Sequence, residues 1–214
     1  MQQQVFMFYI VAAGVIEEGS DLPEAEKKLG IQEDEDITNG MYTPSVPKFQ
    51  LELVSPVTWE TVDIVQLLEG EQVLAIECVE LHSTETTTGR KQYAAVATSY
   101  MRSEDLACRG RILLYEIIDV VPEPGNPQTN HKFKLYCKTD EKAPVTALVG
   151  VNGNLLASIG TKIIMYAVEE GELNGIAFLD VNIFVVSLSA VKNLILVSDI
   201  FKSVWFVCFQ VLDY

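Results

Sequence analysis

The sequence predicts an all-β protein, a partial β-propeller built of WD-repeat-like blades. Three observations lead to this prediction: some fourteen short apolar segments rich in β-branched residues, almost no helical periodicity, and a strand–turn–strand motif that occurs three times. The copies are Tyr93–Ser99 with Gly110–Tyr115, then Leu155–Tyr166, then Leu194–Phe206. Ser158 stands 40 positions before Ser198 in the last two copies. A self-similar unit of about this length is typical of a propeller blade, which buries its faces only by stacking on neighbours.

The predicted strands follow one another along the chain. An apolar segment at 5–16 comes first, and residues 17–48 are an acidic loop and a proline-containing connector. The remaining predicted strands are 49–54, 59–67, 73–81, 93–98, 111–118, 132–138, 145–149, 155–159, 163–168, 176–179, 183–188, 194–197 and 204–209. At four antiparallel strands per blade, they make about three to four blades. We therefore divide the chain into blade strands at 1–16, an acidic flexible loop and connector at 17–48, and propeller blades at 49–214.

Two polar segments between these strands are predicted to be surface loops. Residues 82–90 form a threonine-rich hairpin tip, and the three prolines and one glycine of 121–127 forbid a continuous ladder there. Loops on a rigid scaffold commonly carry binding residues. The candidate partner-binding residues are Arg90, Lys91, Pro122, Glu123, Pro124 and Gly125.

The charge of the chain disfavours direct binding of nucleic acid. The chain has thirty acidic and fifteen basic residues, which give a formal net charge of −15. Binding of a phosphate backbone depends on its neutralisation by cations, and the basic groups here are small, such as Arg90 with Lys91 and Arg109 with Arg111.

The four cysteines are isolated, without C-x-x-C spacing, and each lies in or beside an apolar stretch. This pattern predicts small buried thiols in a reducing compartment rather than disulfides or a metal site. The apolar segment 5–16 lacks a positively charged region before it and is too short to span a bilayer. We therefore interpret it as a blade strand.

No pattern of an enzyme stands out. The two histidines, His82 and His131, fall in polar loops where surface positions are expected, and neither a G-x-S-x-G elbow nor a phosphate-binding glycine loop is present. Residues 34–40 resemble a calcium loop, but Ser45 occupies the position where a bidentate glutamate is required. The sequence predicts a protein that is not an enzyme, without a cofactor, a metal or a small-molecule substrate.

The sequence of residues 108–134 points to a particular protein family. Cys108–Leu113, Val120–Thr129 and Lys132–Lys134 closely resemble the family of the largest subunit of the cleavage and polyadenylation specificity factor. The resemblance covers about residues 49–210 and includes Leu53–Glu60, Ala143–Leu148, Asn152–Leu155, Ala157–Ile163, Leu173–Phe178, Val191–Asn193 and Asp199–Ser203. The Val-Pro-Glu-Pro-Gly loop and the Ser-Pro-Val-Thr-Trp segment favour this family over two paralogous three-propeller proteins, the large damaged-DNA-binding subunit and a splicing factor 3b subunit.

The resemblance implies a nuclear, non-enzymatic scaffold of pre-mRNA 3′-end cleavage and polyadenylation. In that family, the large subunit holds the WD-repeat and zinc-finger subunits that read the polyadenylation signal, so that contact with pre-mRNA is indirect and no membrane is involved. We expect the chain to be a fragment of such a subunit, covering early blades of its third propeller. Two alternatives stay open: a propeller module that binds RNA or other nucleic acid directly, and a ubiquitin-ligase adaptor like the damaged-DNA-binding paralogue.

Overall fold

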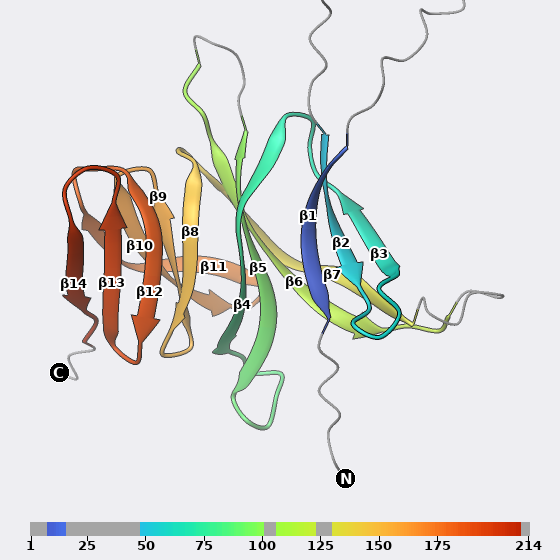
Figure 1. Ribbon diagram of the computed structural model, residues 1–214. Helices are drawn as coiled ribbons and strands as arrows, with labels where there is room; N and C mark the ends of the chain where they lie inside the picture. Colours follow the sequence, from blue (N-terminus) through green and yellow to red (C-terminus); the bar gives the residue numbers. More distant parts are fainter. Residues whose placement is uncertain (1–7, 16–47, 101–105, 123–129, 211–214) are drawn as a thin grey trace, which may run out of the picture.

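The computed structural model describes residues 8–15, 48–100, 106–122 and 130–210, and their regular structure is entirely β-strand (Figure 1). The strands are β1 (Tyr9–Val15), β2 (Lys48–Val54), β3 (Thr61–Gln66), β4 (Glu71–His82), β5 (Arg90–Tyr100), β6 (Gly110–Asp119), β7 (His131–Glu141), β8 (Val145–Val151), β9 (Asn154–Ile159), β10 (Lys162–Glu169), β11 (Glu172–Asp180), β12 (Val185–Val191), β13 (Leu194–Asp199) and β14 (Val204–Cys208). Each predicted strand has its counterpart, so the all-β class is confirmed. Of the predicted acidic loop and connector at 17–48, only Lys48 lies within the described residues.

The strands form four antiparallel sheets, and each sheet joins strands that are consecutive in the chain. The sheets are β1–β3, β4–β7, β8–β11 and β12–β14, and they stand side by side in chain order as the blades of a partial propeller (Figure 1). The expectation of four strands per blade is right for the two central sheets. The two outer sheets have three strands each among the described residues.

The core lies between neighbouring blades. Strand β8 packs against β4 and β5 on one side and against β12 on the other. Successive residues of β5 therefore serve different interfaces: Ala95 and Ala97 are buried against the β8–β11 blade, whereas Ala94 and Val96 pack with Leu51 of the β1–β3 blade. Because side chains alternate along a strand, a strand that is covered on both faces becomes a continuous apolar run. This explains the uninterrupted Tyr-Ala-Ala-Val-Ala segment.

The strand–turn–strand motif that occurs three times in the sequence forms the second and third strands of three blades. These strand pairs are β5–β6, β9–β10 and β13–β14. The first strand of each of these blades contains a register shift, between Val73 and Ala75, Val145 and Ala147, or Val185 and Ser187. In the β8–β11 blade, Ser158 Oγ accepts a hydrogen bond from the Ala147 N–H at 2.9 Å and lies 2.7 Å from Thr146 Oγ1. The repeated small polar residue thus satisfies the backbone where the bulge interrupts the ladder.

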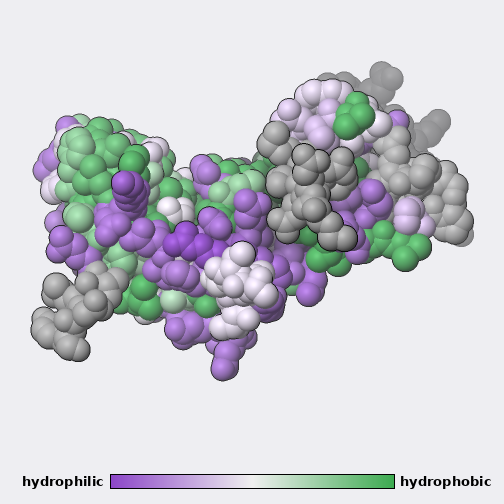
Figure 2. All heavy atoms as spheres, turned by 90° about the horizontal axis from the view of Figure 1, so that it is seen from below, coloured by the Kyte–Doolittle hydropathy of each residue, from purple (hydrophilic) through white to green (hydrophobic). Residues whose placement is uncertain are grey.

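The outer face of the β12–β14 blade is exposed. The equivalent face of the β8–β11 blade is buried, because the β12–β14 blade covers it. Ser158 pairs with Ile163 across β9 and β10, and the β12–β14 blade covers this pair. The equivalent pair is Ser198 with Val204, and Val204 is 53% exposed whereas Ile163 is 4% exposed. Phe206, which also lies on this outer face, is 73% exposed. Figure 2 shows the resulting apolar surface at the end of the molecule that β12–β14 form.

This equivalence predicts unequal effects of two similar substitutions. Ile163→Val is expected to lower the free energy of unfolding by about 0.5–1.5 kcal/mol, because it removes a methyl group from a packed interface. Val204→Ala should change it by no more than about 0.5 kcal/mol, because the side chain is exposed. Chemical denaturation of both variants measures the difference. Equal losses would show that the two positions are equally buried in solution.

Candidate functional site

Two of the predicted partner-binding residues, Arg90 and Lys91, are the first two residues of β5 and lie at the tip of the β4–β5 hairpin. Lys91 Nζ lies 2.7 Å from a carboxylate oxygen of Glu85 and 2.7 Å from one of Glu116. Burial lowers the pKa of Lys91, but its hydrogen bonds to Glu116 and Glu85 outweigh burial and raise the pKa above its usual value. Lys91 is therefore a charged residue whose charge is already matched within the chain. Arg90 lies 3.9 Å from Glu80, and both side chains are exposed, so this pair contributes little.

The predicted loop after β6 begins at the same end of the sheet. The register of β5 with β6 runs from Ala97–Ile112 to Ala94–Tyr115, so the start of β5 and the end of β6 lie together. Pro122 is exposed, and Val120 N donates to Asn130 O at 2.8 Å to close the base of the loop. Glu123, Pro124 and Gly125 lie outside the described residues.

His131, which follows this loop, is buried rather than on the surface as predicted. Its Nε2 lies 2.8 Å from an Asp119 carboxylate oxygen and its Nδ1 lies 2.6 Å from Asn130 Oδ1. The cysteine prediction is also partly wrong. All four described thiols are free, as expected, but Cys137 is buried, Cys108 is half-buried, and Cys78 and Cys208 are exposed.

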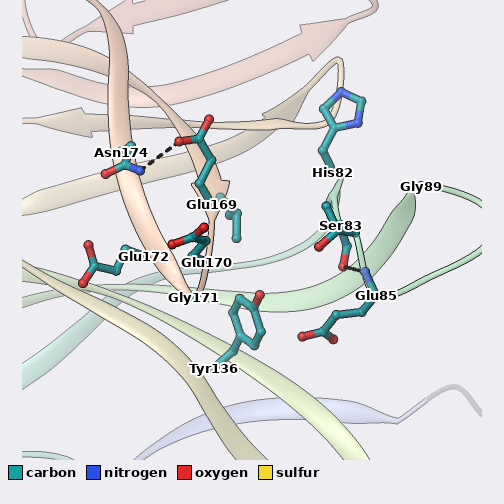
Figure 3. A pocket seen from close by; sticks show the side chains of 12 residues that line it. His82, Ser83, Glu85, Gly89, Tyr136, Glu169, Glu170, Gly171, Glu172 and Asn174 are labelled. Carbon is teal, nitrogen blue, oxygen red and sulfur yellow. Dashed lines mark hydrogen bonds between the residues drawn. The ribbon is translucent and has the colours of Figure 1, made fainter.

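A groove of about 1070 Å³ lies near the predicted residues, between the β4–β7 and β8–β11 blades (Figure 3). The β4–β5 hairpin supplies one wall, with His82, Ser83 and Glu85. The turn between β10 and β11 supplies the opposite wall, and Tyr136 of β7 lies between them. This groove could not be predicted from the sequence, because its walls are almost 90 positions apart along the chain. Only the stacking of blades brings them together.

The groove is lined by four carboxylates. They belong to Glu85, Glu169, Glu170 and Glu172. Glu85 pairs with Lys91, and Glu169 accepts a hydrogen bond from Asn174 Nδ2 at 3.2 Å. Within the part of the chain that the structure describes, Glu170 and Glu172 form no ion pair. Glu170 and Gly171 both have positive φ, 51° and 82°, which is the conformation of a tight hairpin turn that holds these side chains out from the blade.

The hairpin wall is fixed to the next blade through the turn at Asn152 and Gly153. Both residues have positive φ, 48° and 79°, as a two-residue type I′ turn requires. His82 N donates to Gly153 O at 2.8 Å, and a Cβ on Gly153 would come within 2.5 Å of the His82 ring. The glycine therefore permits both the backbone conformation and the close approach of the two blades.

A buried hydroxyl lies beside two of the residues that line the groove. Tyr93 is 2% exposed, and its ring packs 5.0 Å from that of Tyr136. The Tyr93 hydroxyl lies near the side chains of Ser83 and Tyr136, which line the groove, but it forms no well-aligned hydrogen bond with them or with any other described residue. Burial raises the pKa of Tyr93 to about 12.

Tyr93→Phe is expected to raise the free energy of unfolding by about 1 kcal/mol, because a buried hydroxyl without a partner destabilises a fold by roughly 1–3 kcal/mol. Chemical denaturation measures this gain. Tyr136→Phe serves as the matched control, since it removes a hydroxyl from the groove surface and should be nearly neutral. A loss of stability in Tyr93→Phe would mean that the hydroxyl is hydrogen-bonded in the free protein.

The chemistry that this groove offers is recognition of positive charge. Carboxylates attract cations, and the faces of tyrosine rings do so as well; Lys91 Nζ already lies 5.9 Å from the centroids of both Tyr93 and Tyr136. The described residues contain no group of three or more side chains suited to holding a metal ion. No helix among them is long and apolar enough to cross a membrane.

Comparison with known families agrees with this architecture. The family described as the CPSF A subunit region matches residues 48–214, which is most of the chain. The chain belongs to the CPSF A subunit family. The resemblance to the large subunit of the cleavage and polyadenylation specificity factor is thereby confirmed.

Relatives of this CPSF A chain extend the comparison. Cleavage and polyadenylation specificity factor subunit 1 of Drosophila melanogaster is 40% identical over 169 residues, which are 78% of this chain and 12% of the relative. Protein cft1 of Schizosaccharomyces pombe is 41% identical over 169 residues, with the same shares of the two chains. A relative in Caenorhabditis briggsae is 32% identical over 211 residues, 94% of this chain and 14% of its own. The chain spans about an eighth of the length of the first two relatives.

Two segments that carry the CPSF A resemblance form tight turns. In the segment before β3, Trp59 N donates to Ser55 O at 2.9 Å, and Trp59 has a φ of 60°, which is unusual for a bulky residue. Its ring stacks on that of Tyr9 at 5.2 Å, so the predicted strand from residue 59 begins only at Thr61. In the second segment, Asp199 Oδ1 accepts hydrogen bonds from the N–H groups of Phe201 at 2.9 Å and Ser203 at 3.2 Å.

The stability of the second turn, which contains Asp199, is expected to depend on pH. Hydrogen bonds from Trp205 Nε1, at 2.9 Å, and from the turn N–H groups lower the pKa of Asp199 to about 2. A lowered pKa means that the carboxylate stabilises the turn above its ordinary pKa of 3.8 and loses this effect as the pH falls through about 2. We expect the carboxyl ¹³C resonance of Asp199 to titrate with a midpoint near 2. A midpoint near 3.8 would show that the turn is open in solution.

Proposed function

We propose that this chain is part of a nuclear, non-enzymatic scaffold in pre-mRNA 3′-end cleavage and polyadenylation. The observation that carries the proposal is the family match over residues 48–214, together with relatives named as subunit 1 of the cleavage and polyadenylation specificity factor. The proposed role is to hold the WD-repeat and zinc-finger subunits that read the polyadenylation signal.

The structure supports a binding role in two ways. The blades stack through apolar interfaces, which makes a rigid platform, and two loops of one blade begin at the same end of its sheet. The net charge of −15 favours contacts with proteins over contacts with phosphate, so we propose that pre-mRNA is reached through the partner subunits.

The test is a pull-down of the tagged full-length protein from nuclear extract, with quantitative mass spectrometry. The WD-repeat and zinc-finger subunits are expected to be enriched, and treatment with ribonuclease should leave this enrichment unchanged. A tag-only sample is the control. Absence of both subunits would contradict the proposal, loss of both on ribonuclease treatment would favour direct RNA binding, and enrichment of cullin scaffolds in their place would favour the ubiquitin-ligase adaptor.

A further inference from the structure

The groove between the two central blades has a surplus of negative charge that faces solvent. Of its four carboxylates, the one of Glu85 is paired with Lys91, and Lys91 also pairs with the buried Glu116. The carboxylates of Glu170 and Glu172 have no cation beside them within the described residues. Charges confined in a concave surface focus the electrostatic potential, so this groove attracts cations more strongly than a flat acidic surface does.

A second observation points to a ligand at the same place. The hydroxyl of Tyr93 is buried beside Ser83 and Tyr136, which line the groove, and forms no well-aligned hydrogen bond among the described residues. A hydroxyl in this state destabilises the free protein, and a phenylalanine in its place would fill the same apolar site. A ligand that contributes a hydrogen-bonding group at the floor of the groove relieves this cost.

We propose that the groove binds a lysine- or arginine-bearing segment of a partner protein. Such a segment supplies cations for Glu170 and Glu172, an N–H or carbonyl group for the Tyr93 hydroxyl, and a side chain to lie against the Tyr136 ring. The inference rests on the proposed scaffold role, because it specifies the chemistry of one partner that the scaffold holds. RNA fits poorly, since its phosphates carry the same sign of charge as the groove.

The dimensions of the groove agree with an extended peptide. Its volume of about 1070 Å³ is slightly above the range of about 300–1,000 Å³ for pockets that hold drug-sized molecules, and its walls come from two blades. The walls are anchored, because the hairpin tip bonds to Gly153 and the opposite turn closes in two residues. The site is therefore formed before the ligand arrives, which limits the ordering cost of binding.

The test is a binding titration of the full chain with a fluorescein-labelled peptide, Gly-Arg-Gly-Lys-Gly-Arg-Gly-Lys, followed by fluorescence anisotropy. The groove variant carries Glu169→Gln, Glu170→Gln and Glu172→Gln. The matched control carries Glu60→Gln, Glu69→Gln and Glu77→Gln, three exposed glutamates outside the groove, so both variants change the net charge equally. Circular dichroism checks that both variants are folded. We expect the groove variant to bind at least tenfold more weakly and the control to bind as the wild type does.

Equal affinities of the groove variant and the control would overturn the proposal, because they would show that the peptide responds only to total charge. Tyr93→Phe is expected to weaken binding at least threefold while making the free protein more stable; unchanged affinity would overturn the assignment of Tyr93. A single-stranded RNA of the same length that binds as tightly as the peptide would also overturn the proposal. Failure of the peptide to bind, with the nuclear partners still retained in the pull-down, would reject this groove without rejecting the scaffold role.

Discussion

Arg111→Met is expected to lower the free energy of unfolding by about 3–5 kcal/mol, because it leaves the Glu71 carboxylate buried without its cation. Glu71 is fully buried. Arg111 Nε donates to Glu71 Oε1 at 2.7 Å, and Arg111 Nη2 pairs with the second carboxylate oxygen. Thr98 Oγ1 adds a hydrogen bond to Glu71 Oε1 at 2.6 Å, so the pair ties β4, β5 and β6 together.

The loss is expected to depend on pH. Burial raises the pKa of Glu71, but hydrogen bonds from Arg111, Thr98 and the Leu68 N–H outweigh it and hold the pKa below its ordinary value of 4.5. A lowered pKa contributes stability that is fully present above 4.5 and is lost as the pH falls through the pKa of the folded protein. The difference between wild type and Arg111→Met should therefore be full near neutral pH and shrink below pH 4.5.

Urea denaturation of Arg111→Met beside Arg109→Met measures this effect. Arg109 is exposed, and the described residues give it no ion pair, so its loss should change stability by no more than about 0.5 kcal/mol. The double variant Glu71→Met/Arg111→Met should recover much of the loss, because no charge is then left buried. Losses of equal size in the two single arginine variants would contradict a buried ion pair.

Gly110→Ala is expected to destabilise the protein by about 3 kcal/mol or more, at or above the usual range for overpacking. Gly110 begins β6, where this strand passes close to the start of β8. A Cβ there would collide with the Thr98 carbonyl oxygen and would come within 2.7 Å of the Val145 nitrogen. Both are backbone atoms, so the collision is relieved only if one of the strands moves.

Gly150→Ala is the matched control for this substitution. A Cβ on Gly150 would lie 3.6 Å from the Val79 side chain, which is ordinary van der Waals contact. We expect a change of no more than about 0.5 kcal/mol in thermal or urea unfolding. Similar losses in both variants would contradict a close approach of strands at Gly110, because a Cβ on Gly150 makes only ordinary van der Waals contact.

The strands could be predicted from the sequence because the signal for a strand is local. Alternation and β-branched residues mark strands such as β12 within a few positions, and the 40-residue spacing of Ser158 and Ser198 reports the stacking of similar blades. The number of strands in each blade was harder to predict from the sequence. Which sheet a strand joins is decided by contacts between blades, and these are absent from any single segment.

The candidate site was predictable only in part, for the same reason. The hairpin tip at Arg90 and Lys91 could be recognised as a loop, but Glu116, which neutralises Lys91, is 25 positions away. Glu170 and Glu172 lie in an ordinary-looking turn, and only the packing of β8 against β4 and β5 places that turn opposite the hairpin. His131 lies in a polar stretch, yet Asp119 and Asn130 satisfy both of its nitrogens and allow it to be buried.

The most direct test of the account is zero-length carboxyl-to-lysine cross-linking of the native cleavage and polyadenylation complex that contains the full-length protein, followed by mass spectrometry. The central claim is that this chain is a scaffold whose acidic groove holds another subunit. We expect cross-links from Glu170 or Glu172 to a lysine of a different subunit, and their loss when the groove glutamates are replaced by glutamine. Cross-links that run from these glutamates only to lysines of the same chain, in a complex that is otherwise intact, would contradict it.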